Sequence, residues 1–445
     1  MSFKSEVLLR QLAELSELAV APARYVVAFS GGLDSAVLLH ALAASRASHQ
    51  VPVVAVHVDH GLHAESATWA DHCQVFANEL EIEFHGLQVD VDRQSGMGLE
   101  AAAREVRYAA LRNLVQPNDW LLSAHHKDDQ AETLLLNLMR GSGPAGLAGI
   151  GSVRSFAQGW LVRPLLDVSR NDLEKYAAEQ GLAWVDDPSN DDQQFDRNFL
   201  RHEVLPQLET RWPDAAGRIR RSAALAREAT LLLTDLAASD LEQVCDRPDR
   251  LLISKLKGLS PARQRNVLRH VVSSLGLPTP GAVHLEQIQS HLLEAREDAQ
   301  PHVTWTGVSV RRYREHLYLL PGAAEDALLP EAMPFVGEQL ELPAGLGSLV
   351  LAPGADKGLS DEVIVKGLEV RYRIGGEEFK PAGQAHTRKL KQLLQDEGIV
   401  PWMRERLPLL YSGGELVAVA DLWVAAFAMS DAGTAIEWRN RPAIR

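Results

Sequence analysis

Apolar runs and helical repeats alternate along the first 160 residues of the chain. Short runs rich in Val, Leu and aromatic residues, typical of strands, occur at 24–29, 51–58, 82–91 and 119–124. Segments with apolar residues at helical spacing follow them at 36–45, 66–80 and 99–115. Repeated β-α-β units with short connections predict an α/β fold with a doubly wound parallel sheet. Ligands of such a sheet bind at the carboxyl ends of its strands.

The pattern changes after residue 207. Helical spacing continues without strand alternation and includes a long segment from Ala215 to Val244. Ser260 followed by Pro261 predicts a helix start, 303–321 predicts short strands, and the Pro- and Gly-containing stretch 321–332 predicts a linker. Short strands and a basic helix complete the chain. We expect a catalytic α/β domain at 1–206, a mainly helical domain at 207–320 and a small α+β domain at 332–445.

Composition and charge narrow the class of protein. A chain of 445 residues exceeds what one hydrophobic core usually supports, and 46% hydrophobic with 23% charged residues is ordinary for a globular protein. No apolar run approaches the roughly 18 residues of a membrane span, and the charged N-terminus does not resemble a signal peptide, so we expect a cytoplasmic protein without a membrane partner. The formal net charge of −14 disfavours indiscriminate nucleic-acid binding, so an RNA partner requires local basic patches.

The segment Ser30–Ser35, with sequence SGGLDS, lies between a predicted strand and a predicted helix. Backbone N–H groups at such a turn point toward an anion, and Gly31 and Gly32 allow close approach. The Ser30 and Ser35 hydroxyls add donors. Asp34 would repel a phosphate unless a divalent cation bridges them, which indicates Mg²⁺. The segment matches neither the Walker A nor the dinucleotide glycine pattern, and an ordinary glycine-rich turn is the alternative.

A second polar segment, HHKDDQAET at 125–133, follows the strand at 119–124. Asp129 and Glu132 are three residues apart and project from one face of a helix. Such carboxylates can hold an ammonium group, coordinate Mg²⁺ or accept a proton from an amine, whereas Asp128 fits a role at the helix N-terminus. A metal-hydrolase site is the alternative, but its candidate ligands have no recognised zinc spacing: His57, Asp59, His60, His63, His125 and His126.

The SGGLDS segment resembles the signature of the PP-loop, or N-type, ATP pyrophosphatases. The segments HVDHGL, HHKDDQAET, RGSGPAGLAGI, RPLLDVSR, DDPSN, FDRNFLR and WMRERLPLL occur in the order found in the tRNA(Ile)-lysidine synthetase family, which the chain resembles over most of its length. The resemblance implies ATP-dependent adenylation of C2 of the wobble cytidine in the CAU anticodon of tRNA(Ile). Free L-lysine then displaces AMP to give lysidine, which changes codon reading from AUG to AUA. The family often forms dimers, so a homodimer is a possible assembly.

The resemblance also assigns roles to residues. It implies catalytic roles for Asp34, Asp129 and Glu132, with Asp34 also a tentative Mg²⁺ ligand. The residues expected to bind ATP are Ser30, Gly31, Gly32, Leu33, Asp34, Ser35, Ala55, His57 and His125. Asp129 and Glu132 are expected to handle lysine, and the flexible segment 140–150 either accommodates the target base or simply ends a helix.

Basic residues supply the expected substrate contacts. Arg104 and Arg107 would pair with the lysine carboxylate or a phosphate, or instead form surface salt bridges with Glu100 or Glu105. Arg197 and Arg201 would contact RNA phosphates or brace the ATP site. A basic surface for tRNA is expected within 215–244, from Arg218, Arg220, Arg221 and Arg227, and within 371–406, including Arg371, Arg388, Lys389 and Arg404. Trp402 either stacks on a base or packs in a core.

Two alternative functions follow from the same residues. A PP-loop tRNA thiolase would add sulfur after the same adenylation, but such enzymes generally need several cysteines or a cluster. Only Cys73 and Cys245 are present, far apart in sequence and outside any CxxC pattern, which also argues against a disulfide framework. A catalytically inactive tRNA- or nucleotide-binding homologue is the other alternative, against which the intact Asp34, Asp129 and Glu132 argue.

Overall fold

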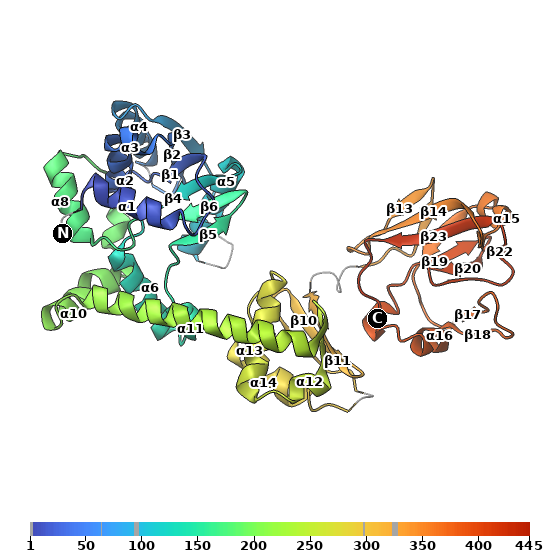
Figure 1. Cartoon of the computed structure of the whole chain (residues 1–445). Helices are drawn as coiled ribbons and strands as arrows, with labels where there is room; N and C mark the ends of the chain where they lie inside the picture. The colour runs from blue at the N-terminus through green and yellow to red at the C-terminus, as the bar shows by residue number, and fades with distance from the viewer. Residues whose placement is uncertain (1–2, 64, 93–97, 297–298, 323–327) are drawn as a thin grey trace. The chain divides into compact units, whose positions relative to one another are not determined.

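The computed structural model describes residues 3–63, 65–92, 98–296, 299–322 and 328–445 (Figure 1). The chain divides into two compact units, Met1–Leu232 and Leu233–Arg445, and the boundary falls inside the long helix α11 (Ala215–Val244). This helix has the bounds that the sequence predicts. No helix in the described parts of the chain is long and apolar enough to cross a membrane.

The first unit contains a six-stranded sheet of order β3-β2-β1-β4-β6-β5, in which only the edge strand β5 is antiparallel to its neighbour. The chain runs outward from β1 through β2 to β3 and then returns to place β4 on the other side of β1. The carboxyl ends of β1 and β4 therefore flank the point where the strand order reverses, which is where such sheets bind ligands. The strands are β1 (Arg24–Ala28), β2 (Val53–Asp59), β3 (Glu83–Gln88), β4 (Asp119–Leu122), β5 (Val153–Phe156) and β6 (Gly159–Val162).

Helices cover both faces of this sheet, because alternate strand residues point to opposite sides. Tyr25 and Val27 of β1 belong to one core, together with side chains of α1, α2, α4 and α8. Val26 belongs to a second core, with side chains of α5. The doubly wound fold is confirmed. The helices are α1 (Ser5–Leu15), α2 (Leu33–Ala44), α3 (Arg46–His49), α4 (Ser66–Glu79), α5 (Leu99–Leu114), α6 (Lys127–Met139), α7 (Pro144–Leu147), α8 (Arg170–Gln180), α9 (Asp196–Phe199) and α10 (Leu205–Arg211), with a π-helical turn η2 at Leu200–Val204.

The hairpin of β5 and β6 was not predicted. Its strands have four residues each, too few to show a clear period, and Gly159 begins the second one. Strand β6 pairs in parallel with β4 and thus extends the sheet beyond the switch point.

The second unit contains a five-stranded sheet of order β7-β8-β11-β10-β9, which shares one core with the end of α11, with α12, α13 and α14, and with a π-helical turn at Ile288–Leu292. Helix α13 starts at Pro261 after the N-cap Ser260, as predicted. Strands β7 and β8 lie where the sequence pattern predicts only helix, so this region contains more strand than expected. The elements are β7 (Cys245–Arg247), β8 (Arg250–Leu252), α12 (Ile253–Lys257), α13 (Pro261–Ser274), α14 (Ala282–Gln287), β9 (His302–Trp305), β10 (Val308–Tyr313) and β11 (His316–Pro321).

Residues 332–445 form two further five-stranded sheets and short helices, in agreement with the predicted α+β class. The expected linker at 321–332 includes residues 323–327, which lie outside the described residues. One sheet contains β12 (Ala332–Phe335), β16 (Leu368–Arg371), β19 (Leu409–Ser412), β20 (Glu415–Val419) and β21 (Trp423–Val424). The other contains β13 (Gln339–Glu341), β14 (Ser348–Ala355), β23 (Gly433–Arg439), β15 (Gly358–Leu359) and β22 (Met429–Ser430). Beside them lie β17 (Glu378–Phe379), β18 (Arg388–Lys389), α15 (Asp361–Val365) and α16 (Leu390–Asp396).

Candidate active site

The loop Ser30–Ser35 connects β1 to α2 and has little freedom to change shape. Gly31 adopts a φ of +84°, and a Cβ at this position would lie 2.7 Å from Sγ of Cys73. Both observations require glycine here. The Gly31 carbonyl accepts a hydrogen bond from Val185 N (2.9 Å), and the Oγ atoms of Ser30 and Ser35 lie 3.1 Å apart. Contacts with Val185 and Cys73 therefore hold the loop in this conformation.

The other residues expected around ATP are of two kinds: backbone N–H groups that can donate to a ligand, and buried side chains that pack beneath the site. The first N–H groups of α2 have no acceptor within the helix, and the helix dipole favours an anion at this end. The side chains of Leu33 and Ala55 lie in the hydrophobic core, so only their backbone groups could contact a ligand. His57 Nδ1 donates to Phe29 O (3.0 Å), and burial lowers the pKa of this imidazole, which keeps it neutral.

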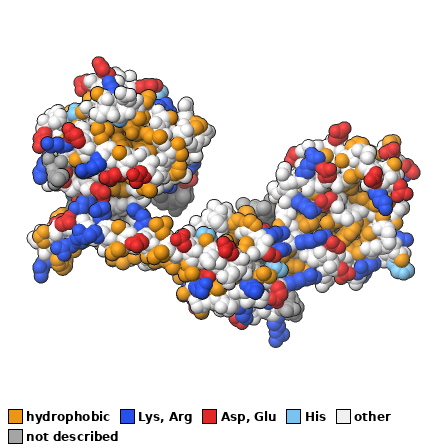
Figure 2. All heavy atoms as spheres, viewed as in Figure 1, with side chains coloured by type: hydrophobic (Ala, Val, Ile, Leu, Met, Phe, Trp, Pro, Cys, Tyr) orange, Lys and Arg blue, Asp and Glu red, His pale blue; other side chains and the backbone are white. Residues whose placement is uncertain are grey.

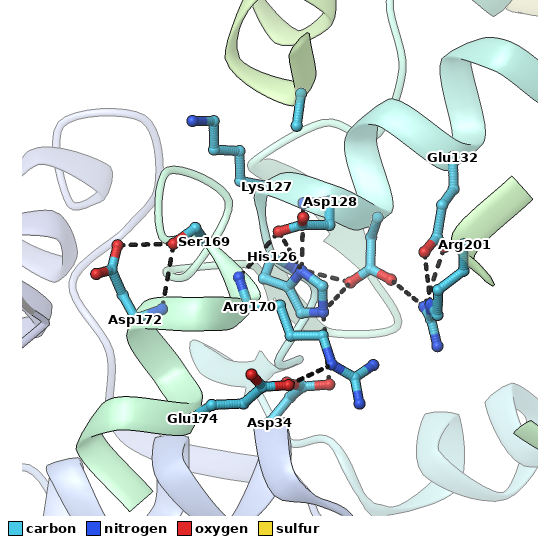
Figure 3. A network of polar contacts seen from close by, with 12 residues as sticks. Asp34, His126, Lys127, Asp128, Glu132, Ser169, Arg170, Asp172, Glu174 and Arg201 are labelled. Atoms are coloured by element: carbon cyan, nitrogen blue, oxygen red, sulfur yellow. Dashed lines mark hydrogen bonds and ion pairs between the residues drawn. The ribbon is translucent and has the colours of Figure 1, made fainter. Parts of the chain in front are cut away.

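His126, at the end of the β4 connection, is fully buried among three carboxylates. Its Nε2 lies 3.5 Å from oxygens of Asp34 and Asp129, and its Nδ1 lies 3.5 Å from Asp128 (Figure 3). Burial opposes a charge on the ring, but the carboxylates prevail and raise the pKa of His126 to about 10. The ring is then an imidazolium, and its Nδ1–H donates to the Asp128 carboxylate. A neutral Nδ1 would instead accept the long hydrogen bond from Asp128 N (3.3 Å).

The neighbouring His125 has the opposite character. Burial lowers its pKa to about 3; Asp129 opposes this shift, whereas Arg163, Arg197 and Arg104 each add to it. His125 Nδ1 is hydrogen-bonded to Ser123 Oγ. Two adjacent histidines thus have opposite charge states, one a fixed cation and the other neutral.

Asp129 and Glu132 of α6 are paired with two arginines. Arg197 Nε lies 2.6 Å from Glu132 Oε2, and its Nη2 lies 2.8 Å from Asp129 Oδ1. Arg201 Nε lies 2.6 Å from Glu132 Oε1, and its Nη2 lies 3.3 Å from Asp129 Oδ1. Glu132 has no exposed surface. Burial alone would raise the pKa of Asp129, but His126 and Arg197 lower it to about 2.

The balance of charge in this cluster favours one further cation. Four carboxylates, those of Asp34, Asp128, Asp129 and Glu132, face the three cations His126, Arg197 and Arg201. Oδ1 of Asp34 is buried without a hydrogen-bond partner among the described residues. This oxygen fits a Mg²⁺ ion, which typically takes one or two protein carboxylates together with phosphate oxygens and water. Within the described residues, no group of three or more His, Cys, Asp and Glu could hold a metal ion by itself.

The segment 140–150, expected to be flexible, is held at its end by side chains from other elements. Gln130 exchanges two hydrogen bonds with the backbone of Ile150, at 2.5 and 2.7 Å. Arg227 of α11 donates to the carbonyls of Ala148 and Ile150, both at 2.8 Å. Gly149 has a φ of +64°, and a Cβ there would lie 2.3 Å from Gln130 Oε1.

Arg104 and Arg107 both lie against the ring of Tyr108 on α5, with guanidinium carbons 5.1 and 5.7 Å from its centroid. The side chain of Glu100, one of the salt-bridge partners considered, lies outside the described part of the chain. The described ion pairs include none between Glu105 and Arg104.

The basic residues expected to bind RNA in the second unit make several contacts of their own. Arg371 pairs with Glu369 and lies over the Tyr411 ring, and Arg388 pairs with Asp396. Arg404 donates to Ile399 O (2.8 Å) and to the Tyr313 hydroxyl (3.0 Å). Trp402 packs edge-on against Tyr313 and Tyr318, so it is a packing residue. Lys389 is exposed.

Comparison with known proteins places this geometry in a family. Residues 4–208 match the PP-loop domain model, 251–318 the TilS substrate binding domain, and 368–438 the TilS substrate C-terminal domain. The tRNA(Ile)-lysidine synthase of Alkalilimnicola ehrlichii is 44% identical, with 99% of this chain and 96% of the relative covered. The chain belongs to the tRNA(Ile)-lysidine synthase family. The enzymes of that name from Coxiella burnetii (40% identical, 94% of this chain and 92% of the relative) and Xanthomonas campestris pv. campestris (43%, 92% of each) are similar over the same extent.

The cysteines of this tRNA(Ile)-lysidine synthase family member are poorly suited to sulfur transfer. Cys73 is fully buried beneath the loop, and burial raises the pKa of its thiol to about 12. Cys245 donates from Sγ to Arg247 O, and burial raises its pKa as well. A thiolate, the reactive form, is therefore disfavoured at both positions.

Replacing Gly31 with Ala should weaken ATP binding at least tenfold, because the new methyl group meets Cys73 Sγ and the backbone is strained at φ +84°. Calorimetric titration with ATP measures this loss. The double variant Gly31→Ala/Cys73→Ala should recover part of the affinity, since the sulfur is gone while the strain remains. Wild-type affinity in the single variant would contradict the assignment.

The raised pKa of His126 predicts a pH-dependent contribution to stability. The folded protein binds this proton more tightly than the unfolded chain, whose histidine pKa is 6.5. The contribution is therefore complete below pH 6.5 and is lost as the pH rises toward 10. His126→Gln should lower the free energy of unfolding by about 3 kcal/mol at pH 6, the range for one partner of a buried ion pair, and by much less near pH 10. Urea unfolding at both pH values measures the two differences, and equal differences would refute the charged state.

Proposed function

We propose that this chain is a tRNA(Ile)-lysidine synthetase, which uses ATP and L-lysine to modify the wobble cytidine of the CAU anticodon of tRNA(Ile). In the first step, the oxygen on C2 of cytosine attacks the α-phosphorus of ATP, and pyrophosphate leaves. In the second, an amine of lysine attacks C2 and loses a proton, and AMP leaves with the oxygen. The products are lysidine, AMP and pyrophosphate, and the modified tRNA reads AUA in place of AUG.

One observation carries the proposal: an anion-binding loop and a cluster of four carboxylates follow β1 and β4, the two strands that flank the switch point of the sheet. The Nε2 atom of His126 lies 3.5 Å from both Asp34 of the loop side and Asp129 of the α6 side. His126 thus joins the two halves of the site. Phosphate transfer and amine chemistry would then take place at neighbouring positions.

In the adenylation step, the N–H groups at the start of α2 and the hydroxyls of Ser30 and Ser35 would hold phosphate oxygens and stabilise the departing pyrophosphate. Asp34 would hold Mg²⁺, and the ion would neutralise phosphate charge as pyrophosphate forms.

In the lysine step, the cluster would attract the amino acid's ammonium group, because its carboxylates outnumber its cations. Asp129 and Glu132 would hold this group by sharing oxygens with Arg197 and Arg201. A carboxylate would then accept the proton from the attacking amine, which reacts only when deprotonated. His125 is neutral and adds no positive charge to repel the ammonium.

The tRNA would be held by basic surfaces on both units. In the view of Figure 2, Lys and Arg side chains gather over α10 and the beginning of α11. Arg218 and Arg221 are exposed there, whereas Arg220 pairs with Asp167. The proposal includes the cytoplasm as the location, where tRNA is available, and a homodimer, which sedimentation of the purified protein would test.

The direct experiment incubates purified protein with ATP, Mg²⁺, radiolabelled lysine and unmodified tRNA(Ile) that carries the CAU anticodon. Label should enter the tRNA, with release of AMP and pyrophosphate. Asp129→Asn and Glu132→Gln should each reduce labelling by at least about 100-fold, because each removes a carboxylate from the lysine site. Binding of tRNA should change less than about twofold.

Glu174→Gln is the matched control, because Glu174 is an exposed acid that pairs with Arg170 outside the carboxylate cluster. It should retain full labelling. If no label enters tRNA with the wild-type protein, the proposed function is wrong. If Asp129→Asn lowers tRNA binding and labelling equally, the carboxylate has only a structural role.

Neutralising Arg388 and Lys389 by alanine substitution should weaken tRNA binding and reduce its dependence on salt. Each lost phosphate contact lowers the slope of log affinity against log salt by about 0.9. Because Arg388 already pairs with Asp396, most of the loss should come from Lys389. Filter binding at several salt concentrations measures the slope, ATP affinity should stay unchanged, and Lys366→Ala is an exposed basic control. An unaltered slope would remove this surface from the RNA contact.

A further inference from the structure

A cavity of about 540 Å³ in the first unit is lined by three arginines and one tyrosine that the reaction scheme above does not use together. We call it the arginine cavity. Its side chains come from α5, from the edge strand β5 and from the segment after β6, and residues 149–151 complete its lining. Its principal side chains are Arg104, Tyr108, Arg154 and Arg163.

The charges of the arginine cavity are unbalanced. Glu105 is the only acidic residue among those that line it, against Arg104, Arg154 and Arg163. Arg104 and Arg154 both lie over the Tyr108 ring, at 5.1 and 5.7 Å from its centroid. In the described ranges, no ion pair is formed by any of the three arginines. Three positive charges beside one negative charge favour an anionic ligand.

Arg163 is the most informative member because it is buried, with 5% exposure. Its Nη1 donates to Gly151 O (2.5 Å), which fixes the side chain against the glycine-containing wall. Its Nε is buried without a hydrogen-bond partner among the described residues. A buried guanidinium with an unused donor, beside two further guanidinium groups, has the chemistry of a phosphate or carboxylate site.

The arginine cavity is separate from the ATP loop but close to the reacting groups. None of the residues that line it belongs to Ser30–Ser35. Ser123 N, two residues before His125, donates to Val162 O (3.1 Å), so Arg163 directly follows a strand residue that is hydrogen-bonded next to His125. Arg104 and Arg163 also lower the pKa of His125. Since the phosphates of ATP have the α2 N-terminus, a second phosphate-binding site next to the reaction centre suits another phosphate-bearing substrate.

We propose that the arginine cavity binds a backbone phosphate of the RNA next to the target cytidine, with the adjoining nucleoside against Tyr108. The volume accommodates a nucleotide-sized group, and two of the residues that line the cavity, Gly149 and Gly151, have no side chain to fill it. This inference rests on the proposed function, because it assumes an RNA substrate. It assigns Arg154 and Arg163 to positioning of the anticodon backbone.

The test uses Arg154→Ala and Arg154→Glu, since Arg154 is exposed and its loss should not disturb folding. The probe is an anticodon stem-loop RNA with the CAU sequence. We expect about tenfold weaker binding for Arg154→Ala, a greater loss for Arg154→Glu, and a salt slope lower by about 0.7, the value for one single-stranded phosphate. Arg163→Lys, which keeps the charge but loses the planar fork, should weaken binding with an unchanged slope.

Arg112→Ala is the matched control. Arg112 lies on α5, the helix that carries the cavity residue Arg104; it is exposed and lies over the Phe156 ring, but it does not line the cavity. A second probe carries a methylphosphonate in place of each phosphate that flanks the target cytidine. Neutralising the relevant phosphate should weaken binding to the wild-type protein and should have no further effect on Arg154→Ala.

Three outcomes would overturn the inference. Unchanged RNA affinity in both Arg154 variants removes the cavity from the RNA site. A loss confined to ATP affinity assigns the cavity to the triphosphate, and a loss confined to the KM for lysine assigns it to the amino acid's carboxylate. RNA binding is measured without turnover, so absence of lysine incorporation by the wild-type protein would refute the proposed function while leaving the Arg154 result interpretable.

Discussion

The buried carboxylate of Glu132 and the guanidinium groups of Arg197 and Arg201 form the contact on which the rest of the site depends. Glu132 comes from α6, directly after β4, whereas its partners lie 65 and 69 residues later in α9 and η2. A carboxylate without exposed surface stays ionised only if cations and hydrogen bonds replace the lost water. The pairing therefore holds the α9–η2 segment against α6, and it supplies hydrogen-bond donors to both carboxylate oxygens of Glu132 beside Asp129.

The same pairing affects how a substrate can bind. Each arginine presents a planar fork to its carboxylates, while an ammonium group is a compact charge with three donors. Under the proposed function, a lysine ammonium would approach the partly accessible Asp129 from directions that the forks leave free, without displacing either arginine completely. His126 has a complementary role, because it keeps Asp34, Asp128 and Asp129 close together despite their mutual repulsion. The site is thus a set of paired charges with a small negative excess, and His126, Arg197 and Arg201 hold its carboxylates together.

Much of this arrangement could be predicted from sequence where the signal is local. The apolar strands, the loop Ser30–Ser35 and helix α11 have short-range patterns, and each appears where the sequence places it. The α6 carboxylates could be proposed as a pair because their spacing is helical. Their arginine partners could not, since the contact joins segments more than 60 residues apart and no local pattern encodes it. His126 was visible only as one of several histidines, and its charge depends on three carboxylates brought together by folding. Arg163 lies in a segment that carries the family resemblance, but its burial is a property of the fold, and Arg154 lies in a hairpin that the sequence pattern did not reveal.

Because Cys73 packs beneath Gly31, the reactivity of its thiol reports whether the loop Ser30–Ser35 is closed or open. Its sulfur has no exposed surface and contacts the loop on which ATP chemistry depends, so an alkylating reagent reaches it only when α4 and the loop separate. The rate of alkylation of Cys73 then measures how often the nucleotide site opens locally. Cys245, in the second unit, is an internal reference for the same reagent. A ligand that binds at the loop would lower the alkylation rate of Cys73, and the measurement needs no label or substitution in the protein.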